Sequence, residues 1–290
     1  MITEKAYGKI NLTLHVGDKR VDGYHEIDSL MHTIDLADDI TLERQEGISL
    51  SVSGENVPEG RDNLMVKAAE VFFRMCGLKG CGAAMTLRKR IPTESGLGGG
   101  SADAAAVLRG LNRLYETQFS LPVLARLGRL VGADVPFLVS GGAARCRGIG
   151  EKLTPFSAWA GLPLLLVKPP VSVATPEAYR LFDAEKGKCP PRTGDALRAL
   201  EVRDGNLLAE SLFNDFEESL FPSVPALGQV KEALREYGAV NLMTGSGSAF
   251  FLLFRDGKKR KETGERIRAE HPEWTVIETQ TIDPFPSGSC

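Results

Sequence analysis

The segment from Pro92 to Leu114 reads PTESGLGGGSADAAAVLRGLNRL and places a glycine-rich loop directly before a helix of small residues. Gly96, Gly98, Gly99 and Gly100 let the backbone adopt positive φ and approach a ligand closely. Apolar residues recur at helical spacing from position 104 to 114 and predict a helix over roughly residues 101–114. The first N–H groups of such a helix are unpaired and its start is partly positive, so the segment predicts a phosphate-binding site.

Two common phosphate-binding motifs do not fit this loop. The P-loop needs a lysine after its glycines, and none follows here. The dinucleotide motif G-x-G-x-x-G, counted from Gly96, meets Ser101 where its third glycine should stand. A flexible linker is the remaining alternative, but a linker has no reason to enter a well-phased helix through alanines, so we favour the phosphate site.

Composition limits the other possibilities. A chain of 290 residues with 42% hydrophobic residues can form two domains that share a cleft. The formal net charge of −3 gives no general attraction to nucleic acid or anionic membranes, so phosphate binding must be local. The five cysteines form no CxxC pair and are expected to be free thiols. The sequence has neither a signal-peptide core nor a long apolar run, and we expect a soluble, cytoplasmic protein.

Strands and helices mix without a regular βαβ period, which favours an α+β fold over a doubly wound sheet. Alternating residues predict a half-buried strand over 9–16, and a helix is expected near 207–220. A change of composition at residues 156–162 is the candidate boundary between an N-terminal domain (1–155) and a C-terminal domain (156–290).

Polar residues at three other places in the sequence are candidates for a functional site together with the glycine loop. Lys9 and Asn11 lie two residues apart and therefore project from one face of the first strand, unless that face is simply solvated. Asp134 follows a helix stop in the sequence VGADVPF and is either functional or a capping carboxylate. Tyr24 and His25 follow a charged turn and are either functional or part of a surface loop. Taken singly, each of these alternatives is at least as good as a functional role.

Taken together, these segments resemble the GHMP superfamily of small-molecule kinases, with three motifs in the family's order. The matching segments are GKINLTLHVGDKRVDGYHEIDSLMHTIDLAD, IPTESGLGGGSADAAAVLRGLN, VGADVPFLVSGGAARCRGIGE, NDFE at 214–217 and MTGSGSAFF. The resemblance covers nearly the whole chain. It implies a two-domain GHMP kinase fold of the α+β class, with the active site in the cleft between the domains.

The resemblance also implies roles for particular residues. Asp134 would accept the proton of the attacking hydroxyl, and Lys9 would stabilise that carboxylate and the γ-phosphate. ATP is the implied phosphoryl donor with Mg²⁺ as its metal, no dedicated metal site is expected, and Ser101 is a possible metal ligand. The implied ATP-binding residues are Asn63, Lys89, Pro92, Gly96, Leu97, Gly98, Gly99, Gly100, Ser101 and Ala102.

The element R-x-D-G-Y-H at residues 20–25 implies an alcohol substrate that carries a cytidine diphosphate group. By the same resemblance, Tyr24 and Tyr179 would sandwich the cytosine ring, and His25 would pair with its edge. Asn11 and Thr175 would contact the substrate's polar groups. The implied reaction phosphorylates the substrate's 2-hydroxyl in the non-mevalonate route to isoprenoids, with no nucleic acid, membrane or obligate protein partner. The alternatives are another GHMP kinase acting on a sugar, homoserine or mevalonate, and a non-catalytic nucleotide sensor.

Overall fold

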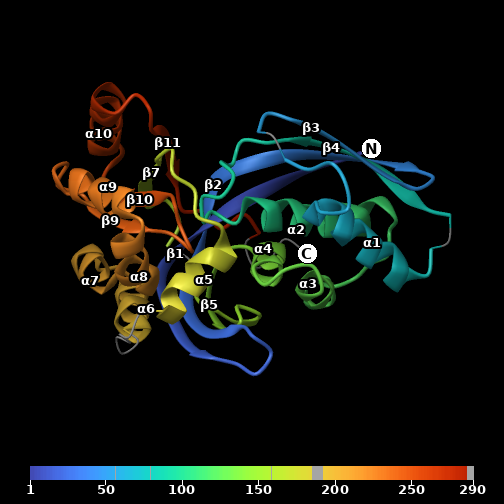
Figure 1. Ribbon diagram of the computed structural model, residues 1–290. Helices are drawn as coiled ribbons and strands as arrows, with labels where there is room; N and C mark the ends of the chain where they lie inside the picture. The colour runs from blue at the N-terminus through green and yellow to red at the C-terminus, as the bar shows by residue number, and fades with distance from the viewer. Residues whose placement is uncertain (56, 79, 158, 185–191, 286–290) are drawn as a thin grey trace. The chain divides into compact units, whose positions relative to one another are not determined.

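The computed structural model describes residues 1–55, 57–78, 80–157, 159–184 and 192–285 (Figure 1). The chain divides into two compact units, the first formed by residues 1–9, 36–93 and 98–141 and the second by 10–35, 94–97 and 142–290. Each unit collects separate stretches because β1 (Ile2–Lys19) and β2 (His25–Gln45) run from one unit into the other. A domain boundary at residues 155 and 156 stays a prediction.

The first unit is a sheet covered by helices. The end of β2 pairs antiparallel with β4 (Gly82–Arg88), and β4 pairs parallel with β3 (Ile48–Ser53). Helices α1 (Leu64–Cys76) and α2 (Gly99–Leu114) pack together beside this sheet, and α3 (Leu121–Arg129) and α4 (Val135–Ser140) pack on α2 (Figure 1). Helix α2 therefore lies between the sheet and the short helices.

Small residues allow α2 to occupy this central place. Eleven of its residues, among them the run from Ala102 to Leu111, are buried, and alanine accounts for four of them. At Gly110 an added Cβ would lie 2.2 Å from Leu42 Cδ1, so a larger residue there would displace the buried Leu42 side chain of β2. Helix α1 is held at its start by Asn63, whose Oδ1 accepts a hydrogen bond from Met65 N.

The second unit contains the rest of the fold. The start of β2 pairs with β5 (Ala143–Gly148), β5 pairs with β6 (Lys152–Pro155), and β1 pairs parallel with β8 (Phe213–Asn214). A separate antiparallel sheet has the order β11-β7-β10-β9, formed by Thr275–Gln280, Pro163–Lys168, Phe250–Leu253 and Val240–Met243.

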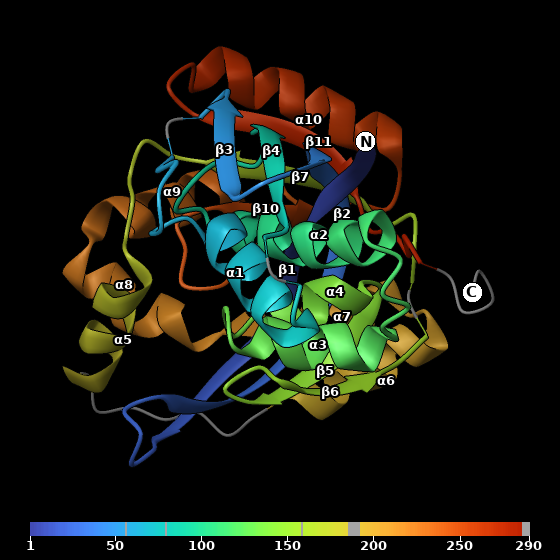
Figure 2. The ribbon, with the colours of Figure 1, turned by 90° about the vertical axis from the view of Figure 1, so that its right-hand side faces the viewer.

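Six helices accompany these strands in the described part of the second unit. They are α5 (Thr175–Ala184), α6 (Thr193–Val202), α7 (Gly205–Ser211), α8 (Asp215–Ser223), α9 (Pro225–Arg235) and α10 (Gly257–Glu270). Helix α10 packs on β7 and β11, as Figure 2 shows from a second direction, whereas α9 packs on α8 and β9. The central strands β7 and β10 are buried because sheet and helices enclose them.

Two sequence-based expectations are corrected by the structure. The first strand is longer than residues 9–16 and is not half-buried, because its polar residues Lys9, Asn11 and Thr13 are as buried as its apolar ones. The helix expected near 207–220 is two helices, α7 and α8, since Asn214 lies in a short strand and begins a new helix by accepting a hydrogen bond from Phe216 N.

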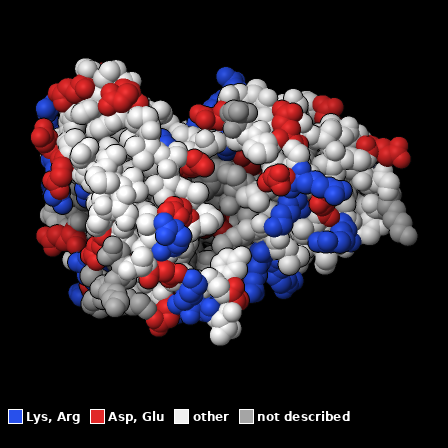
Figure 3. All heavy atoms as spheres, in the orientation of Figure 1, with Lys and Arg blue, Asp and Glu red and all other residues white. Residues whose placement is uncertain are grey.

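Among the described residues, Cys76 and Cys81 are free thiols, as expected, and Cys146 is buried, whereas Cys189 and Cys290 lie outside the described residues. No helix in the described ranges combines the length and apolar character needed to cross a membrane. On the face drawn in Figure 3, basic and acidic side chains are interspersed, in keeping with the small net charge.

Candidate active site

Lys9 and Asp134 come together in the first unit although 124 positions separate them in the sequence. Lys9 Nζ lies 3.7 Å from Asp134 Oδ2, which is an ion-pair distance but longer than a hydrogen bond. The lysine side chain is 4% exposed and the aspartate side chain is 29% exposed. The burial of Lys9 excludes a solvated sheet face, and the pair presents its carboxylate, more than its ammonium, to the surface.

The local structure explains why this carboxylate is available. Asp134 occupies the N-cap position of α4, directly before Val135 and Pro136. Its side chain makes no capping hydrogen bond to the helix, so the alternative of a capping carboxylate does not describe it. The position fixes the backbone of Asp134 and leaves its oxygens free to face Lys9.

The start of α2 lies beside the same pair. Gly98 is the N-cap of α2 with φ of 71°, a left-handed conformation that favours glycine. A Cβ on Gly98 would lie 3.1 Å from Lys9 Cγ, so the lysine stem runs along this position. On the other side, Ser101 Oγ lies 3.8 Å from the place of a Cβ on Gly132, two residues before Asp134. The first unit thus gathers an ammonium, a carboxylate and a positive helix end.

The predicted nucleotide residues at the start of α2 differ in their exposure. Gly100 is exposed, Gly99 and Ser101 are half-buried, and Ala102 is buried with its N–H donating to Gly98 O over 2.8 Å. A Cβ on Gly99 would lie 2.9 Å from Lys89 Nζ, so a larger residue there would displace the Lys89 side chain. Contacts of these residues with ATP stay predictions, and Ala102 has only its backbone to offer.

Lys89 belongs to a buried ion cluster beneath this helix end. Its Nζ donates to Asp38 Oδ2 and, over 2.8 Å, to Asp103 Oδ2, and all three side chains are at most 4% exposed. Asp38 Oδ1 also accepts the backbone N–H of Arg90 and of Ile91. Burial, opposed in part by the Lys89 charge, raises the pKa of Asp103 to about 8. The cluster joins the end of β4 to the first turn of α2.

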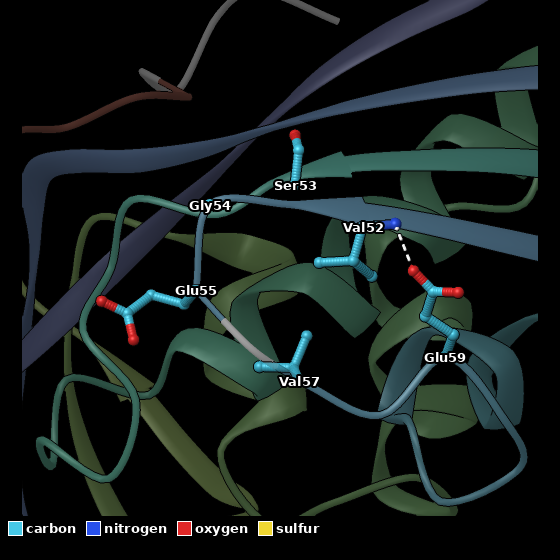
Figure 4. A pocket seen from close by; sticks show the side chains of 6 residues that line it. All are labelled: Val52, Ser53, Gly54, Glu55, Val57 and Glu59. Atoms are coloured by element: carbon cyan, nitrogen blue, oxygen red, sulfur yellow. Dashed lines mark hydrogen bonds between the residues drawn. The ribbon is translucent and has the colours of Figure 1, made fainter.

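A cavity of about 320 Å³ opens beside β3 and the segment that follows it (Figure 4). Six residues line it: Val52, Ser53, Gly54, Glu55, Val57 and Glu59. Glu59 closes one side by accepting the Val52 N–H over 2.9 Å, as the dashed line marks, whereas the Glu55 side chain is turned toward the opposite side.

The residues expected to border the adenosine lie in the segments next to this cavity. Asn63 Nδ2 donates to Pro58 O over 2.7 Å, and its Oδ1 caps α1. Both ends of this side-chain amide therefore stabilise the local structure. Gly54 passes so close to Lys89 that an added Cβ would lie 2.3 Å from Lys89 O. Half-buried Pro92 follows in the turn after β4. Their contact with a nucleotide is untested.

The earlier half of the glycine loop belongs to the second unit. Ala249 N donates to Ser95 O over 3.1 Å, and Ser248 N donates to Glu94 O over 3.3 Å. Gly96 has φ of 75°, and a Cβ there would lie only 2.0 Å from Thr244 O. Leu97 is buried. The stretch Thr244–Ser248, here called the second glycine loop, therefore supports residues 94–97 directly.

Asn11 and Thr175 contact neighbours in the same unit. Asn11 Nδ2 donates to Ser29 Oγ over 2.7 Å, and Asn11 N donates to Thr244 Oγ1 over 2.9 Å. Exposed Thr175 begins α5, and its Oγ1 lies 3.0 Å from Ser246 Oγ. The second glycine loop thus contacts both residues.

An aromatic group surrounds His25 at the start of β2. Tyr179 stacks on the His25 ring with centroids 5.2 Å apart, and Phe182 meets it edge-on. His25 Nδ1 lies 3.0 Å from Gly17 O, and Nε2 lies 3.0 Å from Asp183 Oδ1. Tyr24 is 58% exposed. The surface-loop alternative describes Tyr24 but not His25, which is buried, and a role in binding cytosine is untested for all three predicted residues.

Asp38 and Ser29 are the site residues that sequence reasoning missed. Strand alternation places Asp38 on the same face as the buried Ile40 and Leu42, which was a readable sign of a buried carboxylate. Ser29 carries no comparable sign, because its bond to Asn11 depends on how β1 and β2 meet.

Comparisons with known proteins show which family this chain resembles. Residues 63–142 match the GHMP kinases N terminal domain, and residues 196–274 match the GHMP kinases C terminal family. The 4-diphosphocytidyl-2-C-methyl-D-erythritol kinase of Caldicellulosiruptor saccharolyticus is 41% identical over 91% of this chain and 92% of its own length. The enzyme of the same name from Moorella thermoacetica is 41% identical over 96% of this chain and 99% of its own.

Solved structures give the same picture of the fold. A crystal structure of 4-(cytidine 5'-diphospho)-2C-methyl-D-erythritol kinase superposes with a TM-score of 0.80 at 34% identity, covering 97% of this chain and 99% of that one. A homoserine kinase from Cytophaga hutchinsonii reaches a TM-score of 0.74 at 19% identity, covering 97% of this chain and 96% of that one, which shows likeness of fold alone.

Proposed function

The chain belongs to the GHMP kinase family, and we propose that it is an ATP-dependent kinase that phosphorylates the 2-hydroxyl of 4-diphosphocytidyl-2-C-methyl-D-erythritol. The products are the 2-phosphate and ADP. This reaction belongs to the non-mevalonate route of isoprenoid biosynthesis, and we place it in the cytoplasm. The observation that carries the chemical part is the Lys9–Asp134 pair at the start of α2.

Asp134 accepts the proton of the attacking hydroxyl. Its carboxylate is partly exposed and not used to cap α4, so a hydroxyl can reach it. Lys9, buried 3.7 Å away, supplies positive charge beside the carboxylate and where the transferring phosphoryl group gains negative charge. Phosphoryl transfer asks little covalent chemistry of a protein, so positioning and charge are sufficient roles for this pair.

The start of α2 is suited to the phosphates of ATP. Its N-cap residue, Gly98, has no side chain to satisfy the first N–H groups of the helix, and the neighbouring Gly100 is exposed. The cavity beside β3 is a suitable place for the adenosine, because Asn63, Lys89 and Pro92 lie in the segments next to it. Both features belong to the first unit.

Magnesium fits a site of this kind as a companion of the nucleotide. The described residues hold no group of three or more His, Cys, Asp or Glu side chains that could bind a metal, which suits an ion held chiefly by phosphates and water. Ser101, in the first turn of α2, is the protein hydroxyl that would complete its shell. When bound, the ion neutralises charge on the phosphates.

The second unit supplies recognition of the cytidyl group. Tyr179, already stacked on His25, offers an aromatic face, and exposed Tyr24 offers another. Asn11 and Thr175 lie next to the second glycine loop and bind the substrate's polar groups. His25 pairs with the base edge; its Nδ1 already lies 3.0 Å from Gly17 O, whereas its buried Nε2, 3.0 Å from Asp183 Oδ1, makes no hydrogen bond within the described part of the chain.

Two other functions compete with this one. Another GHMP kinase activity, on mevalonate, homoserine or a sugar, would leave Tyr24, His25 and Tyr179 without a purpose. A non-catalytic nucleotide sensor needs the glycine loop but has no use for a carboxylate and an ammonium held 3.7 Å apart.

The test is ADP release with the cytidyl alcohol, and with mevalonate, homoserine and galactose as controls, in the wild type and in Asp134→Asn. We expect turnover with the cytidyl alcohol alone and a decrease in kcat of about 10²–10⁴-fold in the variant, the usual contribution of a general base. Binding of an ATP analogue should be nearly unchanged. Asp195→Asn, an exposed site in the first turn of α6, is the matched control and should keep full activity. Normal kcat in Asp134→Asn would remove this residue from the mechanism.

A further inference from the structure

The sequence NDFE at the start of α8 is the one matched motif that the roles above leave unexplained. Asn214 is buried, and its amide makes three hydrogen bonds. Its Oδ1 accepts from Phe216 N over 3.0 Å and caps α8, while its Nδ2 donates to Met243 O over 2.7 Å and to Gly245 O over 2.9 Å. One side chain therefore begins a helix and also holds the second glycine loop.

Glu217, in the first turn of α8, holds the same stretch from another point. Its Oε1 accepts from Met243 N over 2.8 Å and from Lys231 Nζ over 2.9 Å. Lys231, on α9, also donates to Asn241 O over 2.7 Å. Side chains of α8, of its N-cap residue Asn214 and of α9 thus bind the backbone of residues 241–245 by four hydrogen bonds.

The second glycine loop needs such support because it has little of its own. Its residues are Thr, Gly, Ser, Gly and Ser, and Gly245 and Gly247 have positive φ. Within itself it makes the bond from Gly247 N to Thr244 O, and at its base Thr244 N donates to Ala249 O. Small residues in unusual conformations bury little apolar surface, so side chains from outside must fix the backbone.

The contacts of the second glycine loop with residues 94–96 explain why it must be held in place. The loop and the residue after it donate to Glu94 O and Ser95 O, and Thr244 O fills the space that a side chain at Gly96 would take. Thr244 Oγ1 also accepts the Asn11 N–H. All of these contacts lie in the second unit, so a shift of Met243 and Gly245 is passed directly to residues 94–96.

We propose that Asn214 and Glu217 are positioning residues for ATP, which act by holding the second glycine loop against Glu94, Ser95 and Gly96. The proposal deepens the proposed function, since it assigns the motif to the nucleotide half of that site. Asparagine suits the position because a single amide is both the acceptor that a helix start needs and the donor for two carbonyls. Aspartate could serve only the first purpose.

The variant Asn214→Ser separates the two purposes. Serine is as good an N-cap as asparagine, so α8 should still begin at residue 215, but its short hydroxyl cannot replace the two bonds to Met243 O and Gly245 O. We expect the Kd for a non-hydrolysable ATP analogue, measured by calorimetry, to rise about fivefold to tenfold, while the thermal midpoint changes by only a few degrees. Asn214→Ala should show the same rise in Kd with a larger loss of thermal stability.

Asp204→Ser is the matched control. Asp204 caps α7 in the same unit by accepting from Asn206 N and Leu207 N, which lie outside the second glycine loop, so its replacement by serine tests capping alone. It should leave the Kd unchanged. Glu217→Gln is a milder second variant, in which the amide oxygen still accepts from Met243 N but the charge that attracts Lys231 is lost. We expect a rise of about twofold to threefold.

Analogue binding is measured without the cytidyl alcohol, so the proposed substrate can be wrong while this test remains decisive. A Kd in Asn214→Ser equal to that of the wild type or of Asp204→Ser would overturn the proposal. So would a KM for the alcohol that rises more than the KM for ATP. If Asn214→Ser does not fold, an unchanged Kd in Glu217→Gln overturns the proposal, and a raised Kd supports it.

Discussion

The two halves of the glycine loop are held by opposite kinds of interaction. Residues 98–101 in the first unit lie over a buried ammonium shared by the side chains of Asp38 and Asp103, whereas residues 94–97 in the second unit are held by neutral backbone hydrogen bonds to the second glycine loop and the residue after it. Charges in a buried cluster depend on one another, because each must be compensated once water is excluded. Neutral hydrogen bonds depend on direction and distance. The halves should therefore respond to different substitutions.

Lys89→Met should produce the largest effect, because it removes the ammonium that lies between Asp38 and Asp103 and keeps most of the side-chain volume. Breaking a buried pair in this way costs about 3–5 kcal/mol of stability. Chemical denaturation would measure the free energy of unfolding, with Lys259→Met on the exposed face of α10 as the control. A loss as small as that of the control would show that the first half does not depend on charge.

Gly96→Ala and Gly98→Ala compare the two halves by one added methyl group. Both glycines have left-handed φ, which costs about 1–2 kcal/mol with an alanine. At Gly96 the methyl group also meets the backbone oxygen of Thr244 at 2.0 Å, whereas at Gly98 it meets the side chain of Lys9 at 3.1 Å. We expect Gly96→Ala to lose more stability than Gly98→Ala. Gly98→Ala should show the larger loss of kcat relative to its loss of stability, because the added methyl group displaces Lys9. Equal losses in both measurements would remove the distinction.

Asp103→Asn should have the smallest effect at neutral pH, clearly below that of Asp38→Asn. With its pKa raised to about 8, Asp103 is mostly protonated at pH 7, so an amide keeps its charge state, whereas Asp38 also accepts two backbone N–H groups. A raised carboxyl pKa favours the folded state below the unfolded value of roughly 4, and that contribution is lost as pH rises through about 8.

The free energy of unfolding, measured from pH 5 to 9, checks the direction of this pH dependence. The wild type should lose stability with rising pH relative to Asp103→Asn. Parallel curves for the two proteins would mean that Asp103 does not titrate in this range.

Sequence reasoning succeeded where the signal was local. The helix entered by the glycine loop and the position of a strand over residues 9–16 follow from helical spacing and alternation within a few residues. It was less successful at Asn214, where the helical pattern on both sides conceals a break. Helix α10 was not anticipated, because its residues are almost all polar and it shows little apolar periodicity.

By itself the sequence determined the α+β class, the loop-to-helix element and the residue types for phosphoryl transfer, since these follow from the order of residues along the chain. Tertiary structure decided which of them meet. Lys9 reaches Asp134, Lys89 reaches Asp38 and Asp103, and Asn214 reaches Met243 and Gly245 only after folding. The physical reason is that a buried charge or amide must find its partners wherever packing brings them, and sequence separation does not encode that distance.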